Sequence, residues 1–469
     1  MSWREASAST QAIILDAAQA AFFISGDRSG LSRRSLQRER LDLKLGICGM
    51  GTVASGVINV LRRNRSAIHE RSGVQLDIVH VGARRDNPNC DISSLTVSRD
   101  VFAVARDPEV ECVVELIGGT TTAHQLVLES IQNGKHVVTA NKALIATHGD
   151  ELFAAAAENN VALRFEAAVA GGIPVIKALQ QGLAANRIDA IAGIINGTGN
   201  YILTEMKEHG RSFEEALADA QALGYAEADP TFDVEGIDAA QKLVVLAALA
   251  YGISFDGDAC FTEGISRIKV DDIRHAETMG YAIKHLGVAK KVDAGLELRV
   301  HPALVPHSEL IASVRGVMNA VAIHGDAVGP TLHYGPGAGS EPTASAVLAD
   351  VIDLAADVAR GQERFDPQQF KTDISIVAMQ QVETPWYLRI PVVDKPGVLS
   401  EVSKALSSAG ISIQSMHQPD AEAGQAQLIL LTNRVAQAEL EAALETIESL
   451  TIVEGEIVSI RVETLGKQD

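Results

Sequence analysis

The pattern of apolar and polar residues predicts alternating strands and helices over the first third of the chain. Residues 43–63 have the pattern of a short apolar strand, a glycine turn and a helix of apolar period. Further strands are predicted at 77–84, 111–119 and 135–142, with a helix at 124–134 that a glycine stops. Strands that alternate with helices predict a doubly wound, Rossmann-like parallel sheet, the first part of an α/β protein.

From about Val161 onward the pattern changes. Longer strand-like runs at 161–170, 187–197 and 296–305 are separated by helices and wide loops, which indicates an α+β domain with a mixed sheet faced by helices. Residues 344–360 form a long amphipathic helical pattern, which we expect to return to the first domain.

The last part of the chain has its own pattern. Residues 361–373 are polar and read as a linker, and from near Thr384 the order is strand, helix, strand, strand, helix, strand. This order predicts a ferredoxin-like unit. We therefore expect five segments: a flexible extension at 1–42, an α/β domain at 43–172, an α+β domain at 173–360, a linker at 361–383 and a terminal domain at 384–469.

Composition narrows the classes of partner. The net charge is −20 and aromatic residues make up 4%, so neither a phosphate backbone nor an anionic membrane is an expected partner. Four cysteines lie far apart without a CxxC pair, which favours a reducing cytoplasm over a disulfide framework.

A glycine turn follows the first predicted strand. Gly49, Gly51 and Ala54 match G-x-G-x-x-G/A, in which the glycines permit a tight turn and a close approach to a pyrophosphate. The following helix offers free N–H groups to phosphate. The alternative is a tight turn without a ligand.

The end of the second predicted strand bears on the choice of cofactor. A carboxylate usually follows this strand when NAD is bound, whereas this chain has Arg84 and Arg85 there. Arginine suits the 2′-phosphate of NADP, with NAD as a possible second cofactor. The alternative is a pair of solvated surface arginines.

Five carboxylates and one lysine crowd into residues 224–243. Asp238 and Lys242 stand four residues apart, so they share one face of a predicted helix. The apolar run 243–253 behind them indicates that this helix is buried, as expected of a scaffold for a polar site. The alternative is a surface ion pair, and Asp229, Asp233 and Glu235 are expected to order the loop or face water.

Seven motifs together resemble the homoserine dehydrogenase family. They are GICGMGTVASGV, ELIGG, VVTANKALIA, RFEAAVAGGIPVI, INGTGNYIL, GYAEADPTFDVEGIDAAQKL and YGPGAGSEPTASAV. The terminal segment VVDKPGVLSEVSKALSSAGISIQSM resembles an ACT domain, as in the monofunctional bacterial form of that family. The resemblance implies interconversion of L-aspartate 4-semialdehyde and L-homoserine, on the route to threonine, methionine and isoleucine.

The resemblance also implies roles for individual residues. Lys242 matches the acid/base lysine, and Lys142 matches a lysine between nicotinamide and substrate. Glu227 and Asp238 match substrate-binding carboxylates, with Lys142 beside them. The implied nucleotide-binding positions are Gly49, Gly51, Thr52, Val53, Arg84, Thr120, Lys142, Gly224, Glu227 and Gly339. A monovalent cation, Na⁺ or K⁺, is implied at Glu166, Val169, Gly171 and Ile173.

Two of these segments have simpler interpretations. Glycines and a proline near 170–174 permit an irregular backbone whose carbonyl groups turn inward to a hard cation, or else an ordinary strand-to-helix turn. Residues 195–203 resemble a glycine loop lining the active site, or else a helix start capped by Thr198 or Asn200.

The ACT-like unit implies L-threonine as an effector and a homo-oligomer, either dimer or tetramer. Asp394–Gly397 lies before a predicted helix N-terminus, which suits an effector carboxylate, although the domain could serve dimerisation alone. Two other functions compete. A non-catalytic amino-acid sensor would lack the residue set above, and a semialdehyde dehydrogenase with a cysteine nucleophile would need a base beside Cys260.

Overall fold

The computed structural model describes residues 41–361, 372–419 and 425–465. Residues 1–40 of the expected extension and 362–371 of the polar segment therefore fall outside the described residues, whereas Leu41 and Asp42 already belong to the first strand. The second part of the expected linker is packed, because the Thr372 N–H donates to the Gly252 carbonyl at 3.1 Å and Ile376 bridges to Leu296.

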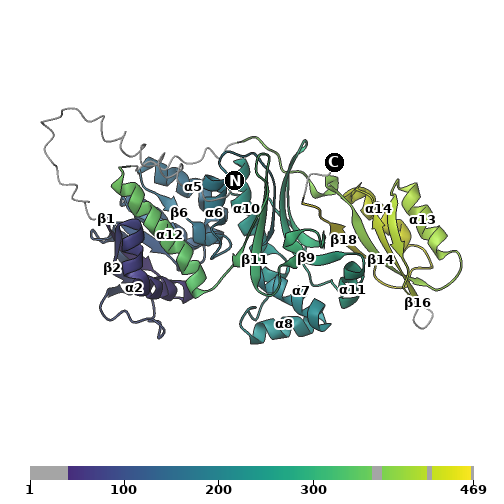
Figure 1. The fold of residues 1–469 in the computed structure, drawn as a ribbon, viewed down its shortest axis with the longest axis horizontal. Helices are drawn as coiled ribbons and strands as arrows, with labels where there is room; N and C mark the ends of the chain where they lie inside the picture. Colours follow the sequence, from purple (N-terminus) through teal and green to yellow (C-terminus); the bar gives the residue numbers. More distant parts are fainter. Residues whose placement is uncertain (1–40, 362–371, 420–424, 466–469) are drawn as a thin grey trace, which may run out of the picture. The chain divides into compact units, whose positions relative to one another are not determined.

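The nucleotide domain is a six-stranded sheet in the order β3-β2-β1-β4-β5-β6 (Figure 1). Its strands are β1 Leu41–Cys48, β2 Val74–Gly82, β3 Thr96–Ser98, β4 Cys112–Glu115, β5 His136–Thr139 and β6 Leu163–Arg164. Its helices are α2 Thr52–Ser72, α3 Phe102–Arg106, α4 Thr121–Gln132 and α5 Lys142–Glu158. The pairs β1–β4, β2–β3, β4–β5 and β5–β6 are parallel, which confirms the doubly wound prediction.

One predicted strand is wrong. Residues 161–170 form only the two-residue strand β6 and the short 3-10 helix η1 (Glu166–Ala168). Ala170 and Gly171 then take positive φ angles of 55° and 43°. The apolar run is buried as expected, but a buried apolar run of this length does not by itself distinguish a strand from irregular backbone.

The second sheet has ten strands and is mixed, as predicted. The order is β12-β11-β7-β9-β10-β18-β14-β16-β15, and β8 pairs with β10. The catalytic part contributes β7 Ile188–Ile194, β8 Phe261–Thr262, β9 Tyr281–Val292, β10 Gly295–Pro306, β11 Met318–Gly325 and β12 Gly329–Pro336. Its helices are α6 Val175–Lys177, η2 Ala178–Gly182, α7 Gly197–His209, α8 Phe213–Ala222, α9 Thr231–Val234, α10 Ile237–Tyr251, α11 Val270–Thr278 and η3 Leu310–Ser313.

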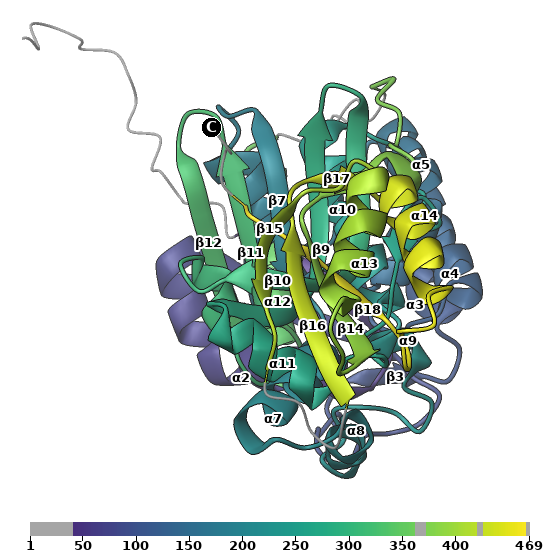
Figure 2. The same ribbon diagram turned by 90° about the vertical axis from the view of Figure 1, so that its right-hand side faces the viewer.

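The terminal unit confirms the predicted βαββαβ order. It comprises β14 Trp386–Val393, α13 Val398–Ser408, β15 Ile413–His417, β16 Gln425–Thr432, α14 Gln437–Glu448 and β18 Val458–Val462. The helix η4 Met379–Gln381 and the short strands β13 Glu383–Thr384 and β17 Val435–Ala436 accompany it. Helices α13 and α14 cover one face of these strands (Figure 2).

The terminal sheet is continuous with the catalytic sheet. Strand β18 pairs with β10 in parallel at Ala303–Arg461 and Leu304–Val462, and with β14 in antiparallel on its other side. The two predicted sheets are therefore one hydrogen-bonded sheet.

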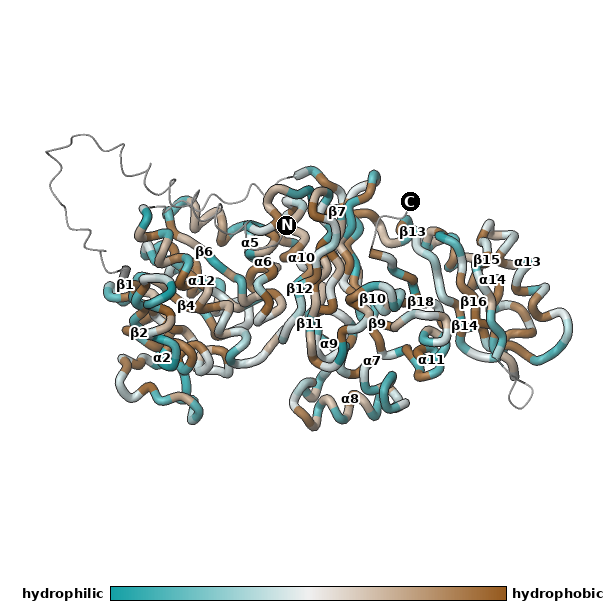
Figure 3. Tube along the Cα trace, viewed as in Figure 1, coloured by the Kyte–Doolittle hydropathy of each residue, from teal (hydrophilic) through white to brown (hydrophobic). Residues whose placement is uncertain are grey.

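Helix α12, Ser340–Ala359, packs against α2 of the nucleotide domain, as expected. Helix α10 is mostly hydrophobic in Figure 3, and eleven of its residues are buried. The fold therefore anchors the N-terminus of α10, where Asp238 lies, in the main apolar core. Among the described residues, no helix combines the length and apolar character that a membrane span requires.

Candidate active site

The glycine turn has the geometry of a phosphate-binding loop. Gly49 has a φ of 110°, and its N–H donates to the Gly82 carbonyl at 2.8 Å, which ties the turn to the end of β2. No heavy atom lies within 4 Å of where a Cβ on Gly51 would be. No side chain caps the start of α2, so the N–H groups near Thr52 and Val53 are available to an anion. The residues present thus fit a dinucleotide pyrophosphate.

The other predicted nucleotide residues surround this turn in different ways. Arg84 is exposed just beyond β2, and it makes no ion pair with the described part of the chain. Gly339 precedes α12, whose first residue Ser340 donates its hydroxyl to the Thr52 carbonyl at 2.7 Å. Thr120 precedes α4. These positions agree with the predicted roles, which remain predictions.

Glu115, a residue without a predicted role, organises the ends of β4 and β5. Its buried carboxylate accepts hydrogen bonds from the Ile117 N–H at 2.8 Å, the Gly118 N–H at 3.2 Å and the Thr139 hydroxyl at 2.5 Å. Burial raises the pKa of Glu115, and these donors oppose that rise. The carboxylate shapes the turn that leads to Thr120.

Lys142 begins helix α5 at the carboxyl end of β5. The Asn141 side chain caps this helix by accepting from the Leu144 N–H at 3.1 Å, and donates to the Gly119 carbonyl at 2.7 Å. The ammonium of Lys142 lies 3.3 Å from Asp238 Oδ1 and 5.7 Å from the centroid of the Phe232 ring. The nucleotide domain thus presents this lysine to the catalytic domain.

Asp238 is the centre of the site. Its side chain is 8% exposed, and Lys242 Nζ lies 2.6 Å from its Oδ2, while Lys142 approaches its other oxygen. Burial alone would raise the pKa of Asp238, but Lys242 and then Lys142 outweigh it and lower that pKa. Lys242 also donates to the Ile195 carbonyl at 2.7 Å, and its side chain is only 13% exposed. A solvated surface pair is therefore the wrong interpretation of Asp238 and Lys242.

Sequence reasoning missed two members of the site. Asn196 Nδ2 donates to Asp238 Oδ2 at 2.9 Å and to Asp233 Oδ1 at 2.7 Å, while its Oδ1 accepts from the Gly199 N–H. Asn196 caps α7, so the predicted caps Thr198 and Asn200 are wrong. Asp233 was expected to order the loop or face water. Burial, with Asp238 nearby, raises the pKa of Asp233 although the Asn196 hydrogen bond opposes this.

We call Lys142, Asn196, Asp233, Asp238 and Lys242 the Asp238 cluster. The segment 195–203 was expected to line the active site or to begin a capped helix, but no local signal singled out Asn196 or Asp233, because their contact joins residues 37 positions apart. Two other predicted residues, Gly224 and Glu227, are exposed in the loop between α8 and α9. The carbonyl of Glu227 accepts from Gln221 Nε2 at 3.0 Å.

The predicted cation segment has the expected irregular backbone. A Cβ on Gly171 would lie 2.4 Å from the Gly337 carbonyl oxygen, and Ala170 has a φ of 55°. The carboxylate of Glu166 accepts from the N–H groups of Ile176 and Lys177, both at 2.9 Å. The Glu166 carboxylate therefore caps the start of α6, which leaves backbone carbonyls as the available ligands for a cation.

Two further groups of reactive side chains carry less chemistry. Burial raises the pKa of the Cys260 thiol to about 12, which disfavours the thiolate that a nucleophile requires. His124, His148 and Glu151 gather on α4 and α5, but the two imidazoles stack with centroids 4.2 Å apart and planes 28° apart. An imidazole binds a metal ion in the plane of its ring. Because the two rings are stacked and nearly parallel, one ion cannot lie in both planes, so this group does not form a metal site.

A phosphate-binding turn after β1, together with a buried Lys–Asp–Lys arrangement whose Lys142 follows β5 of the same sheet, is typical of a nicotinamide-dependent oxidoreductase. Family models agree with this class over most of the chain. "Homoserine dehydrogenase, NAD binding domain" matches residues 49–166, "Homoserine dehydrogenase" matches 174–352 and "ACT domain" matches 386–451.

Individual relatives extend the match over the whole described fold. The homoserine dehydrogenase of Pseudomonas aeruginosa is 54% identical over 432 residues, covering 90% of this chain and 99% of the relative. A crystal structure of the Thiobacillus denitrificans enzyme has 48% identity and a TM-score of 0.84, covering 91% and 99%. A hyperthermophilic archaeal homoserine dehydrogenase in complex with NADPH has 25% identity and a TM-score of 0.56, covering 67% and 98%. The chain belongs to the homoserine dehydrogenase family.

Proposed function

We propose that the chain interconverts L-aspartate 4-semialdehyde and L-homoserine, with the Asp238 cluster as its catalytic site. The observation that carries this proposal is the convergence of two lysines on one buried carboxylate beside the dinucleotide turn. The names of the relatives supply homoserine, and the family resemblance of the motifs supplies L-aspartate 4-semialdehyde.

The cofactor, when bound, supplies or accepts the hydride at the substrate carbon. The chain must then stabilise charge on the substrate oxygen and move one proton to or from it. Lys242 is our candidate acid/base, because Asp238 and the Ile195 carbonyl hold its ammonium in one place. Lys142, which comes from the nucleotide domain, donates a hydrogen bond to the same substrate oxygen. Asp238 orients both lysines and accepts a hydrogen bond from the substrate hydroxyl.

The substrate ammonium needs a carboxylate near the reacting carbon. Glu227 is the residue that the family resemblance assigns to this contact, and its exposed loop precedes α9 directly. Asp233, at the other end of that segment, adds a second acidic group. Closing of this loop over substrate would bring Glu227 to the Asp238 cluster.

NADP is the cofactor we propose, with NAD as a second substrate of lower affinity. The support is Arg84, an exposed arginine beyond β2, and the NADPH bound by the archaeal relative. Replacing Arg84 with alanine should raise the KM for NADP⁺ about tenfold, the loss of one charged hydrogen bond, and leave that for NAD⁺ nearly unchanged. Equal changes for both cofactors would contradict the proposal. Arg99→Ala, which breaks a surface pair with Asp86, is a matched control.

A monovalent cation, Na⁺ or K⁺, is proposed at the carbonyls of Glu166, Val169, Gly171 and Ile173. The irregular backbone with positive φ at Ala170 and Gly171 supports it, since it turns carbonyls out of a regular ladder. Activity assayed in tetramethylammonium buffers, with Na⁺ or K⁺ added back, tests the proposal. Equal rates with and without either ion would refute it.

Threonine regulation at the terminal ACT domain completes the proposal, in a cytoplasmic homo-oligomer, either dimer or tetramer. The start of α13 carries no side-chain cap, and Gly397 before it has a φ of 99°, which suits a carboxylate ligand. The four free, buried cysteines suit a reducing compartment.

A steady-state assay tests the whole proposal. Homoserine-dependent reduction of NADP⁺ is expected, with inhibition by L-threonine and none by D-threonine. No turnover with intact threonine binding would show an amino-acid sensor instead of an enzyme. Sedimentation velocity with and without threonine checks the oligomer.

A further inference from the structure

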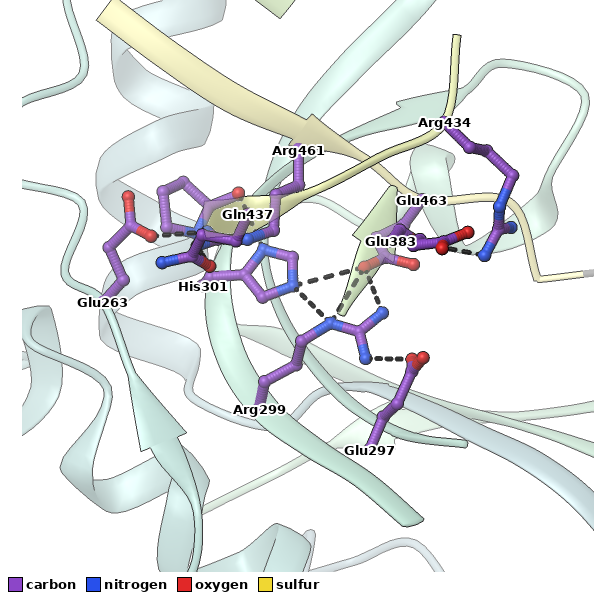
Figure 4. A network of polar contacts seen from close by, with 10 residues as sticks. Glu263, Glu297, Arg299, His301, Glu383, Arg434, Gln437, Arg461 and Glu463 are labelled. Atoms are coloured by element: carbon purple, nitrogen blue, oxygen red, sulfur yellow. Dashed lines mark hydrogen bonds and ion pairs between the residues drawn. The ribbon is translucent and has the colours of Figure 1, made fainter. Parts of the chain in front are cut away.

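A polar network, buried except for the partly exposed Glu263, joins β18 of the ACT domain to the catalytic sheet (Figure 4). We call it the junction network, and it has two arms. In the first arm, Arg299 pairs with Glu297 and with Glu463. In the second arm, Arg461 pairs with Glu263 and donates to Gln437 Oε1 at 2.8 Å.

The second arm is held firmly on the ACT side. The guanidinium of Arg461 lies 4.6 Å from the centroid of the Trp386 ring and 5.4 Å from that of Phe261, and its side chain is 3% exposed. Cation–π contacts of a desolvated guanidinium restrict its position. The Glu263 carboxylate therefore pairs with a guanidinium whose position is fixed by its own strand β18 and by the aromatic rings of β14 and β8.

Glu263 belongs to the loop 262–268, which reaches the substrate site. The Ile265 N–H donates to the Val234 carbonyl at 3.0 Å, and the Ser266 hydroxyl donates to Glu235 Oε1 at 3.2 Å. The Glu263 carbonyl lies 3.0 Å from His285 Nε2. Two routes thus lead from one loop to the segment before α10.

His285 fills the space between the two helix starts of the site. A Cβ on Gly236 would lie 3.1 Å from ring atoms Cε1 and Nε2, and one on Gly199 would lie 3.5 Å from Nδ1. Gly236 precedes α10, which carries Asp238, and Gly199 donates to Asn196. Burial lowers the pKa of His285 to about 4, so the ring is neutral at neutral pH. Because a carbonyl faces Nε2, the single N–H of the ring lies there.

We propose that Arg461, Glu263 and His285 are positioning residues for the substrate site, so that the last strand of the ACT domain helps to place Asn196 and Asp238. The inference rests on the proposed reaction at the Asp238 cluster. The first two steps are an ion pair between Arg461 and Glu263 and a hydrogen bond between the Glu263 carbonyl and His285. In the third step the His285 ring packs close to Gly236 and Gly199, where it leaves little room for a side chain. A small displacement here matters, because misplacing a reacting group by about 1 Å can cost on the order of 100-fold in rate.

Two matched substitutions test the proposal in the full-length protein. Glu263→Gln weakens the arm that leads to the site, and Glu297→Gln weakens the arm that does not. Glu263→Gln should raise the KM for homoserine about tenfold, which is less than the roughly 100-fold loss expected when a reacting group is misplaced by about 1 Å. The KM for NADP⁺ should stay within about twofold of the wild-type value. Glu297→Gln should lower the thermal midpoint at least as much and leave both KM values near those of the wild type.

Substitutions of His285 give a second, independent test. His285→Leu should lower kcat/KM for homoserine by about 10- to 100-fold, and His285→Gln, which keeps an N–H for the Glu263 carbonyl, should recover part of it. If His285→Leu does not fold, the Glu263 and Glu297 pair decides. Equal effects of that pair on the KM for homoserine, or a wild-type KM in Glu263→Gln, would overturn the positioning role. No turnover in the wild type would refute the proposed reaction as well.

Discussion

The Asp238 cluster and the Arg299 arm of the junction network both bury charged groups, but they differ in what those charges have left to do. In the Arg299 arm, Glu463 and Glu297 engage a guanidinium that is 1% exposed. In the Asp238 cluster, Lys142 remains 31% exposed and holds Asp238 at a longer distance of 3.3 Å. A buried ion pair whose partners are all fixed serves the stability or the specificity of the fold. A partly exposed ammonium still has N–H groups that can donate hydrogen bonds to a substrate. Four predictions test this contrast.

The largest effect is expected at Lys242. Lys242→Ala should lower kcat by about 10²- to 10⁴-fold, since general acid–base catalysis contributes that much. The Kd for NADPH, measured by fluorescence titration, should stay nearly unchanged. Lys207→Ala removes a half-buried lysine that pairs with Glu277 outside the cluster and serves as the control. Parallel losses of kcat and NADPH affinity would assign Lys242 a structural role.

The Arg299 arm should respond in stability and not in rate. Glu463→Ala should lower the free energy of unfolding by about 3–5 kcal/mol, because it leaves Arg299 buried beside an empty position. Chemical denaturation and a kcat measurement on the folded fraction check this. A loss under about 1 kcal/mol would show that Arg299 regains solvent or another partner.

Asn196 should show an intermediate effect. Asn196→Ala removes the donor that Asp233 and Asp238 share, so kcat/KM for homoserine should fall about tenfold, corresponding to a lost hydrogen bond to a charged group. The comparison variant is Asn186→Ala, which removes an asparagine side chain that bonds the surface turn at Ala327 and Val328 and the Leu183 carbonyl, away from the Asp238 cluster. If both variants retained wild-type kcat/KM, Asn196 would be a helix cap and nothing more.

The smallest effect concerns pH. Burial would raise the pKa of Glu463, but Arg299 and His301 outweigh it and hold that pKa below its ordinary value of 4.5. Its contribution to stability is therefore fully present above pH 4.5 and lost as the pH falls towards the lowered value, at about 1.4 kcal/mol per pH unit. Denaturation midpoints from pH 3 to 7 should converge for wild type and Glu463→Gln at the acid end. A constant gap would contradict the assigned charge on Glu463.

The parts of the site that the sequence predicted are the local ones. Asp238 and Lys242 were predicted from one helical period, and Lys142 from the family resemblance of its motif. Asn196 and Asp233 were missed, because their contact depends on how α7 approaches α9. The carboxylate of Glu166 caps α6, so the predicted cation contact of Glu166 stays a prediction for its backbone carbonyl.

The fold shows the same limit. Element order predicted the doubly wound sheet and the βαββαβ unit, since both follow from local periodicity. The pairing of β18 with β10, and the contact of Arg299 with Glu463 across 164 positions, has no local signal. At 161–170 an apolar run predicted a strand, but the strand ends at Arg164, and the backbone continues through a 3-10 helix to positive φ angles at Ala170 and Gly171.

The continuous ten-stranded sheet also constrains how such a chain can change its length. Without β18, the backbone groups of β10 at Ala303 and Leu304 would lose their partners and form an open strand edge, a template for association with other chains. A shortened form that ends before Trp386 would therefore need new charges or a bulge along β10 to remain dispersed. Evolutionary loss or exchange of the regulatory domain thus requires compensating substitutions in the catalytic domain.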